Sequence, residues 1–241
     1  MLIKAGDNFG ILYATNIPSQ GFQRFSIAHE LGHYFISGHP DALLSEGFHV
    51  SRAGFVVADP YEQEADYFAA ALLMPERAFR RAMDDHEPGL VCIEALRKAC
   101  ETSLSATAIR YSTLTRDGVA VVVSRGATIE WCFMSEGIKQ ASGLSFLRKG
   151  TPVPKGTLTH QFNAQPDNVR MGRSEVGEGL LNVWLDGEQT YRITEEVVGL
   201  GGYERTLTVL TCSSLSVRPE DEPDEDDEEA LIESWTPRFK R

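Results

Sequence analysis

The residues from 29 to 33 read His-Glu-Leu-Gly-His, and they constrain the fold more than any other segment. Four residues advance an α-helix by about 40° beyond one full turn and by ~6 Å, so both imidazoles leave the same face and can hold one ion. Neutral imidazole is a good zinc ligand, and a Glu directly after the first His can reach a water held by the metal. Chance would produce on the order of 0.01 such motifs at this composition, which disfavours coincidence. We therefore predict a buried helix over residues 22–36, with His29 and His33 as ligands and Glu30 as the catalytic carboxylate.

A third ligand is expected downstream, because catalytic zinc sites keep three protein ligands and one open position. Residues 61–74 are predicted to form a second helix, which carries Glu62, Glu64 and Asp66 in its first turns. Glu62 and Asp66 are four residues apart and share a face that continues into apolar residues, whereas Glu64 lies about 200° round the helix and is expected to point away. We predict Glu62 as the third ligand, with Glu64 as the disfavoured alternative. Asp66 is predicted to hydrogen-bond the outer nitrogen of a ligand His.

The periodicity divides the rest of the chain into a helical half and a half rich in strands. In the first half we expect a strand over 9–15, a loop over 38–60, a helix over 76–83 and a helix in two pieces over 91–115. In the second half no clear period appears over 149–178, and strands are expected at 118–124, 128–133, 180–185, 190–194 and 206–212. The fold class is therefore α+β. We divide it into a domain that carries the predicted zinc site, a helical segment, an antiparallel β-rich domain and an acidic tail: 1–88, 89–117, 118–217 and 218–241.

The formal net charge is −12, and half of it lies in residues 218–241, which hold four basic and ten acidic residues. Such a charge disfavours general binding to nucleic acid or anionic membranes, which needs a basic surface. The helical segment over residues 90–116 could form a helix-turn-helix that reads DNA. It carries only four basic and two acidic residues, which is too little positive charge for a DNA-binding surface, so direct DNA binding is disfavoured. The acidic tail is predicted to be disordered and solvated. The alternatives are that it competes with DNA for a basic partner or that it covers the active site.

The start of the chain, its apolar stretches and its cysteines indicate the cellular compartment in which the protein is expected. The start of the chain has no apolar core of a signal peptide, and no stretch approaches the ~20 apolar residues of a membrane helix, so we expect a cytoplasmic protein without a membrane partner. None of the four cysteines forms a C-x-x-C pair, and free thiols are expected. A cysteine as fourth zinc ligand is disfavoured because none lies near the motifs. No sequence feature indicates an oligomeric state.

Two blocks of the chain resemble the ImmA/IrrE family of bacterial zinc metallo-endopeptidases. Residues 24–33 read Arg-Phe-Ser-Ile-Ala-His-Glu-Leu-Gly-His, and residues 62–75 read Glu-x-Glu-Ala-Asp-x-Phe-Ala-Ala-x-Leu-Leu-Met-Pro. The likeness covers residues 9–116. It implies a helical, gluzincin-like domain with an active-site helix, and it places the family's zinc ligands on His29, His33 and Glu62 and its catalytic carboxylate on Glu30.

The resemblance also implies a substrate. Family members typically cleave a helix-turn-helix repressor and thereby switch on stress, DNA-damage or phage-related genes, so we expect an XRE-type repressor as the partner. Some members carry a helical middle segment and a C-terminal GAF-like domain, to which residues 90–116 and 118–216 are candidate counterparts. Members of the family usually have additional helices before the first strand. In this sequence Met1 lies almost directly before that strand, so we expect either that the start is shortened or that the preceding helices are dispensable.

The expected activity is therefore zinc-dependent hydrolysis of a peptide bond, with manganese as an alternative metal. Zinc lowers the pKa of a bound water from ~15.7 toward ~7, and Glu30 would accept its proton. A second donor to the developing oxyanion is expected, and Tyr61, His49 and His39 are candidates, although each has a structural or merely exposed alternative. The competing hypothesis is a regulatory protein that holds zinc and controls the repressor by binding without cleavage.

Overall fold

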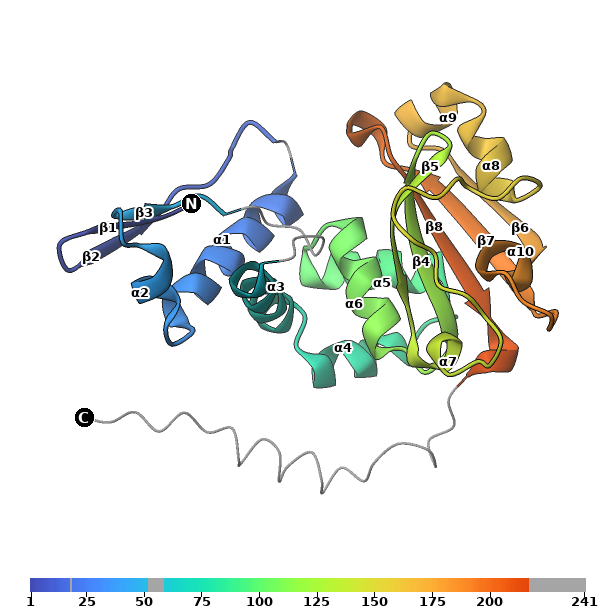
Figure 1. Cartoon of the computed structure of the whole chain (residues 1–241), viewed down its shortest axis with the longest axis horizontal. Coiled ribbons are helices and arrows are strands. Elements are labelled where there is room, and N and C mark those ends of the chain that lie inside the picture. Colours follow the sequence, from blue (N-terminus) through green and yellow to red (C-terminus); the bar gives the residue numbers. More distant parts are fainter. Residues whose placement is uncertain (18, 52–58, 217–241) are drawn as a thin grey trace, which may run out of the picture.

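The computed structural model describes residues 1–17, 19–51 and 59–216, which form an N-terminal helical part and a C-terminal sheet (Figure 1). The helical part carries a small three-stranded sheet at its outer side. Helices α5 and α6 lie between the helical part and the five-stranded antiparallel sheet. This arrangement confirms the predicted α+β class, in which a helical half precedes an antiparallel half.

Helices α1 (Gln20–Phe35) and α3 (Pro60–Leu73) carry the two sequence blocks, and both have N-terminal caps that the sequence encodes. The Ser19 side chain accepts a hydrogen bond from the backbone N–H of residue 22 at the start of α1. The Asp59 carboxylate does the same for the N–H of residue 61, and Pro60 occupies the first helical position, where its missing N–H costs nothing. The helices predicted over 22–36 and 61–74 are therefore confirmed to within two residues.

The two helices pack closely because small residues meet at their contact. A Cβ on Gly32 of α1 would lie 3.0 Å from the Ala65 Cα of α3 and 3.2 Å from the Phe68 Cβ. Ala65 and Ala69 are completely buried. This approach turns one face of the His-Glu-Leu-Gly-His segment toward the acidic face of α3.

The small sheet has the order β2-β1-β3 and is antiparallel throughout. Its strands are β1 (Leu2–Ala5), β2 (Asn8–Ile11) and β3 (Phe48–His49). The strand expected over 9–15 corresponds to β2 and ends earlier, at Ile11. The region expected as a loop contains β3 and the short helix α2 (His39–Leu43), and residues 52–58 of it lie outside the described residues.

Helices α4 (Glu76–Met83), α5 (Leu90–Cys100) and α6 (Leu104–Leu114) follow the predicted pattern, including the break between α5 and α6. They share one hydrophobic core with the site helices and the large sheet. This core includes the buried side chains of Phe25, Ala69, Phe79, Ile93, Leu96, Tyr111, Val121 and Val209. The helical segment expected over 89–117 therefore packs directly on both halves, and the domain boundaries stay predictions.

The large sheet is antiparallel with the order β5-β4-β8-β7-β6. Its strands are β4 (Gly118–Arg125), β5 (Thr128–Met134), β6 (Ser174–Leu180), β7 (Arg192–Gly199) and β8 (Thr206–Cys212). Its connections contain α7 (Glu136–Lys139), α8 (Leu158–Asn163), α9 (Pro166–Arg170), α10 (Leu181–Leu185) and a 3₁₀ turn, Gly201–Tyr203. A second 3₁₀ turn, Ser213–Leu215, follows β8. The likeness to GAF domains stays a prediction, and the acidic tail expected over 218–241 lies outside the described residues.

One predicted strand is wrong. Residue 180 ends β6, and residues 181–185 form α10 instead, because Leu181, Trp184 and Leu185 have helical spacing and all three are buried. The strand lies just before this segment, in β6, whose Gly- and Glu-rich sequence is mostly exposed at the sheet edge and lacks apolar alternation. The strand expected over 190–194 runs on to Gly199 as β7.

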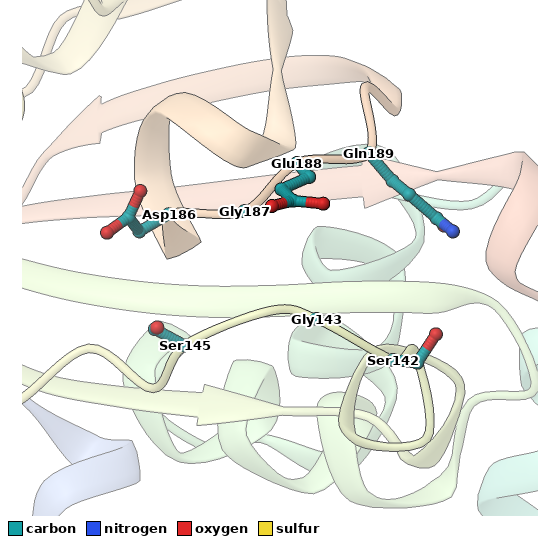
Figure 2. Close-up of a pocket in the computed structure, with 7 residues that line it drawn as sticks. All are labelled: Ser142, Gly143, Ser145, Asp186, Gly187, Glu188 and Gln189. Carbon is teal, nitrogen blue, oxygen red and sulfur yellow. The ribbon is translucent and has the colours of Figure 1, made fainter.

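The β-rich part also contains a polar cavity of about 600 Å³ (Figure 2). It lies between two loops, one that contains Ser142 and Ser145 and one that runs from Asp186 to Gln189. Among the described residues, none of the helices combines the length and apolar composition that a membrane crossing needs. All four cysteines are free thiols, as the sequence predicts.

The start of α1 makes a close backbone contact that can be tested. A Cβ on Gly21 would lie 2.4 Å from the Thr102 carbonyl carbon and 2.5 Å from the Ser103 nitrogen, in the turn between α5 and α6. We predict that Gly21→Ala lowers the free energy of unfolding by about 1–3 kcal/mol in urea titrations, because backbone must move to admit the methyl group. Gly10→Ala is the control, since nothing lies within 4 Å of its added Cβ. Equal stability of the Gly21 variant and wild type would contradict this packing.

Candidate metal centre

The side chains of His29, His33 and Glu62 meet between α1 and α3, and their ligand atoms all lie within 4.8 Å of one another. The His29 Nε2 atom lies 3.0 Å from His33 Nε2 and 3.3 Å from Glu62 Oε2. His33 Nε2 lies 3.4 Å from Glu62 Oε1. Both histidines are completely buried, and Glu62 is 5% exposed. Two imidazole nitrogens and a carboxylate oxygen are the donor set of many catalytic zinc sites, so these residues fit a zinc ion.

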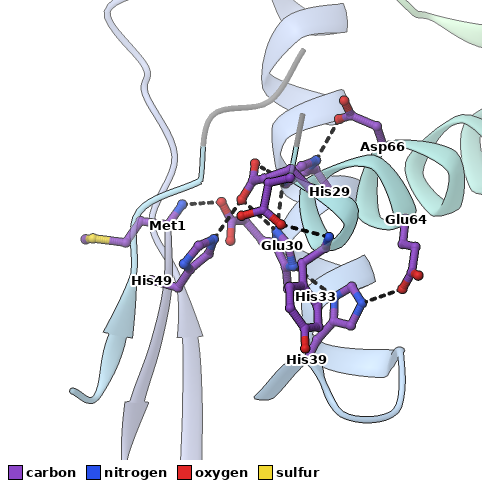
Figure 3. Close-up of polar contacts among 11 residues, drawn as sticks. Met1, His29, Glu30, His33, His39, His49, Glu64 and Asp66 are labelled. Carbon is purple, nitrogen blue, oxygen red and sulfur yellow. Dashed lines mark hydrogen bonds and ion pairs between the residues drawn. The ribbon is translucent and has the colours of Figure 1, made fainter. Parts of the chain in front are cut away.

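Asp66 lies behind His29, on the side away from Glu62. The Asp66 Oδ1 atom is 2.8 Å from His29 Nδ1 and accepts a hydrogen bond from it (Figure 3). A carboxylate at this position holds a proton on Nδ1 and leaves the Nε2 lone pair for a metal. The structure thus places Asp66 where the sequence analysis puts it, four residues from Glu62 on the same inward face of α3.

The two histidines differ in their affinity for protons. Burial lowers the pKa of His29, but its hydrogen bonds to Asp66 and Glu62 and the charges of these groups outweigh burial and raise the pKa to about 9. Burial lowers the pKa of His33. The hydrogen bond to Glu62 acts against this effect without cancelling it, and the positive charge of His29 also lowers the pKa. In the metal-free protein His29 is therefore protonated near neutral pH, whereas His33 is neutral.

Glu30 lies beside the ligand group without belonging to it, although it is only 2% exposed. One of its carboxylate oxygens accepts a hydrogen bond from the Met1 amino group. The other, Oε2, is buried and has no hydrogen-bond partner among residues 1–17, 19–51 and 59–216. A buried carboxylate oxygen without a partner is costly unless a ligand or water completes it, which is the situation expected beside a metal site.

The three candidate oxyanion donors occupy different places. His49 comes from β3, and its Nε2 atom lies 2.8 Å from Glu62 Oε1. His39 lies behind His33, with its Nδ1 atom 3.1 Å from His33 Nδ1. The Tyr61 ring packs edge-on against the His39 ring, with 4.9 Å between the ring centres. His49 thus contacts Glu62 directly, and the oxyanion role stays a prediction for all three residues.

Glu64 points away from the ligand group, in agreement with the 200° expected from helix geometry. Its side chain is 58% exposed, but its Oε2 atom lies 2.8 Å from His39 Nε2. The sequence does not predict this contact. The contact spans 25 residues, and it depends on the conformation of a segment expected to be a loop.

The model of the IrrE N-terminal-like domain, of the M78 peptidase family, matches residues 10–112. The match includes α1, α3 and all three residues of the ligand group, and it extends into α6. Residues 10–112 are an IrrE N-terminal-like domain. This part of the chain is therefore a metallopeptidase domain of the M78 family, and its buried His29, His33 and Glu62 are consistent with a metal site.

No curated protein matches the chain. Among solved structures, a transcriptional regulator from Mycobacterium tuberculosis is similar, with 20% sequence identity and a TM-score of 0.47. The similarity covers 80% of this chain and 56% of the regulator's chain. The present chain thus corresponds to little more than half the length of that protein.

The pKa values of the two histidines predict how zinc binding depends on pH. Since His29 has a pKa of about 9 and must lose a proton to bind zinc through Nε2, zinc competes with that proton at lower pH. We expect about one proton to be released per zinc near pH 7, and apparent affinity to rise about tenfold per pH unit toward the pKa. Calorimetry in buffers of different ionisation enthalpy measures the released protons.

The matched variant for this measurement is Asp66→Asn. It removes the hydrogen bond that most raises the pKa of His29, so fewer protons should be released near pH 7. Zinc binding by wild type without proton release, or equal release from both proteins, would contradict the account.

Proposed function

We propose that the protein is a zinc-dependent endopeptidase that cleaves a helix-turn-helix repressor and so relieves repression of stress, DNA-damage or phage-defence genes. The observation that carries the proposal is the buried group of His29, His33 and Glu62 with Glu30 beside it. The M78 domain supports the peptidase part of the proposal. The repressor as substrate is supported by the family resemblance alone.

His29, His33 and Glu62 would hold the zinc ion, and Asp66 would keep the His29 ring in the orientation that binds it. When bound, zinc supplies Lewis-acid chemistry that polarises a peptide carbonyl and acidifies water. Glu30 would accept the proton of the attacking water and pass it to the leaving amine, as a general base and then a general acid. Its burial keeps the carboxylate out of bulk water, where competing solvent would weaken each electrostatic contact.

His49 is the best-placed of the three candidates to assist at the developing oxyanion. Its ring lies 4.9 Å from the His33 ring, and its side chain remains 18% exposed, so it borders both the ligand group and solvent. A ring N–H at this border can reach a substrate that enters from solvent, whereas His39 is 1% exposed and has both ring nitrogens in contact with protein.

The charge of the chain is compatible with a basic protein partner. A repressor that binds DNA presents a basic surface, and a net charge of −12 favours its approach over that of free nucleic acid. The proposed setting is the cytoplasm, where such repressors act and where the four free cysteines stay reduced.

The test is incubation of the zinc-loaded protein with the helix-turn-helix repressor encoded next to its gene. We predict that wild type produces a defined new fragment. Glu30→Gln should retain zinc at wild-type stoichiometry but lose cleavage by about 10²–10⁴-fold, because the proton acceptor is gone while the ligands remain. Glu94→Gln, a change at an exposed carboxylate on α5, is the control and should cleave normally.

Each other outcome has a definite meaning. Release of the repressor from DNA without any cleavage would favour the regulatory protein that acts by binding. Full cleavage by Glu30→Gln would overturn the role of Glu30. A wild-type protein that neither cleaves nor releases the repressor would overturn the proposed substrate.

A further inference from the structure

We propose that Glu64 and His39 are positioning residues for the metal centre, which act by fixing the ring orientation and tautomer of His33. We call the chain of contacts from Glu64 through His39 to His33 the Glu64 relay. The inference rests on the proposed zinc site, because it concerns how one ligand of that site is held. It assigns a function to two residues that have no part in the ligand group itself.

The relay is continuous in the structure. The Glu64 Oε2 atom lies 2.8 Å from His39 Nε2, and His39 Nδ1 lies 3.1 Å from His33 Nδ1 (Figure 3). The inner nitrogen of His33, Nε2, faces His29 and Glu62. Each nitrogen of both rings therefore has a defined neighbour, and the line runs from the surface of α3 to the centre of the ligand group.

Only one arrangement of protons suits both this geometry and metal binding. A carboxylate only accepts hydrogen bonds, so Glu64 places the proton of neutral His39 on Nε2 and leaves its Nδ1 atom as an acceptor. His33 must then donate from its own Nδ1, and its Nε2 lone pair is free for the metal. Without Glu64, His39 can take the other tautomer, which would put the His33 proton on the ligand nitrogen.

The backbone turn before α2 fixes the position of His39. It is the first residue of α2, directly after Gly38, whose φ of +90° belongs to the left-handed region. This turn brings the chain back over the end of α1, where His39 is only 1% exposed although it is a polar residue. The ring packs against Tyr61 on one side, which restricts its rotation further.

The two ligand histidines are thus held by the same principle. Asp66 contacts the outer nitrogen of His29 directly, and Glu64 reaches the outer nitrogen of His33 through one additional imidazole. Both carboxylates come from α3, as does the third ligand, Glu62. This explains why three acidic residues alternate at the start of one helix when only one of them belongs to the ligand group.

The experiment measures the zinc dissociation constant by competition with a chelating dye, together with urea unfolding of the metal-free protein. We expect His39→Leu to weaken zinc binding roughly 10–100-fold, the usual effect of losing a hydrogen-bond partner behind a ligand His. His39→Asn should recover part of that loss, because its side-chain oxygen can still accept a hydrogen bond from His33. Glu64→Gln should weaken binding by about 2–5-fold, a small effect because the carboxylate is largely exposed.

Two controls separate positioning from general damage to the fold. His86→Leu removes an exposed imidazole elsewhere, and Asp41→Asn removes an exposed carboxylate on the same short helix as His39. Both should bind zinc as wild type does. If His39→Leu weakens zinc binding no more than these controls, the relay is wrong, whatever the effect on unfolding.

The decisive comparison is the double variant. Because Glu64 acts only through His39, adding Glu64→Gln to His39→Leu should cause no further loss of zinc affinity. Equal effects of Glu64→Gln in the two backgrounds would overturn the relay while leaving the zinc site intact. A wild-type protein that binds no zinc would instead overturn the proposed function, and the relay with it.

Discussion

The close packing of α1 on α3 is the constraint on which the rest of this structure depends. A Cβ on Gly32 would lie 3.0 Å from the Ala65 Cα, which is closer than most side chains approach a neighbour. With the helices packed in this way, the ligand atoms of His29 and His33 from one helix and Glu62 from the other lie within 4.8 Å of one another. The same contact brings Asp66 behind His29, so a single helix pair supplies the ligands and the first support for them.

This packing buries a set of ionisable side chains, which would be unfavourable in a purely hydrophobic core. His29, His33, Glu30, Glu62 and Asp66 are all at most 5% exposed. Burying ionisable groups costs free energy unless they pair with opposite charges or coordinate a metal. Three carboxyl groups around two imidazoles favour a cation, and the same negative charges raise the pKa of His29. The surrounding core from α4, α5, α6 and the large sheet holds the two helices in place.

Much of the site could be predicted because it follows from helix periodicity. The spacing of His29 and His33 places them on one face, and the same rule separates Glu62 and Asp66 from Glu64. The parts that the sequence does not predict depend on contacts between distant segments. The contact of His39 with Glu64 needs the turn at Gly38, and β3 is too short to show a strand pattern. In the second half, buried residues with helical spacing at 181–185 look like a strand when only their apolar character is considered.

The central claim is that His29, His33 and Glu62 hold one zinc ion, and X-ray absorption at the zinc edge of the purified protein tests it most directly. We predict one zinc per chain, with nitrogen and oxygen neighbours at ~2.0–2.2 Å and the scattering pattern of two imidazoles. Replacing Glu62 with Ala should remove one oxygen neighbour or abolish zinc binding. A sulfur neighbour at ~2.3 Å, or a zinc environment unchanged by the Glu62 substitution, would contradict it.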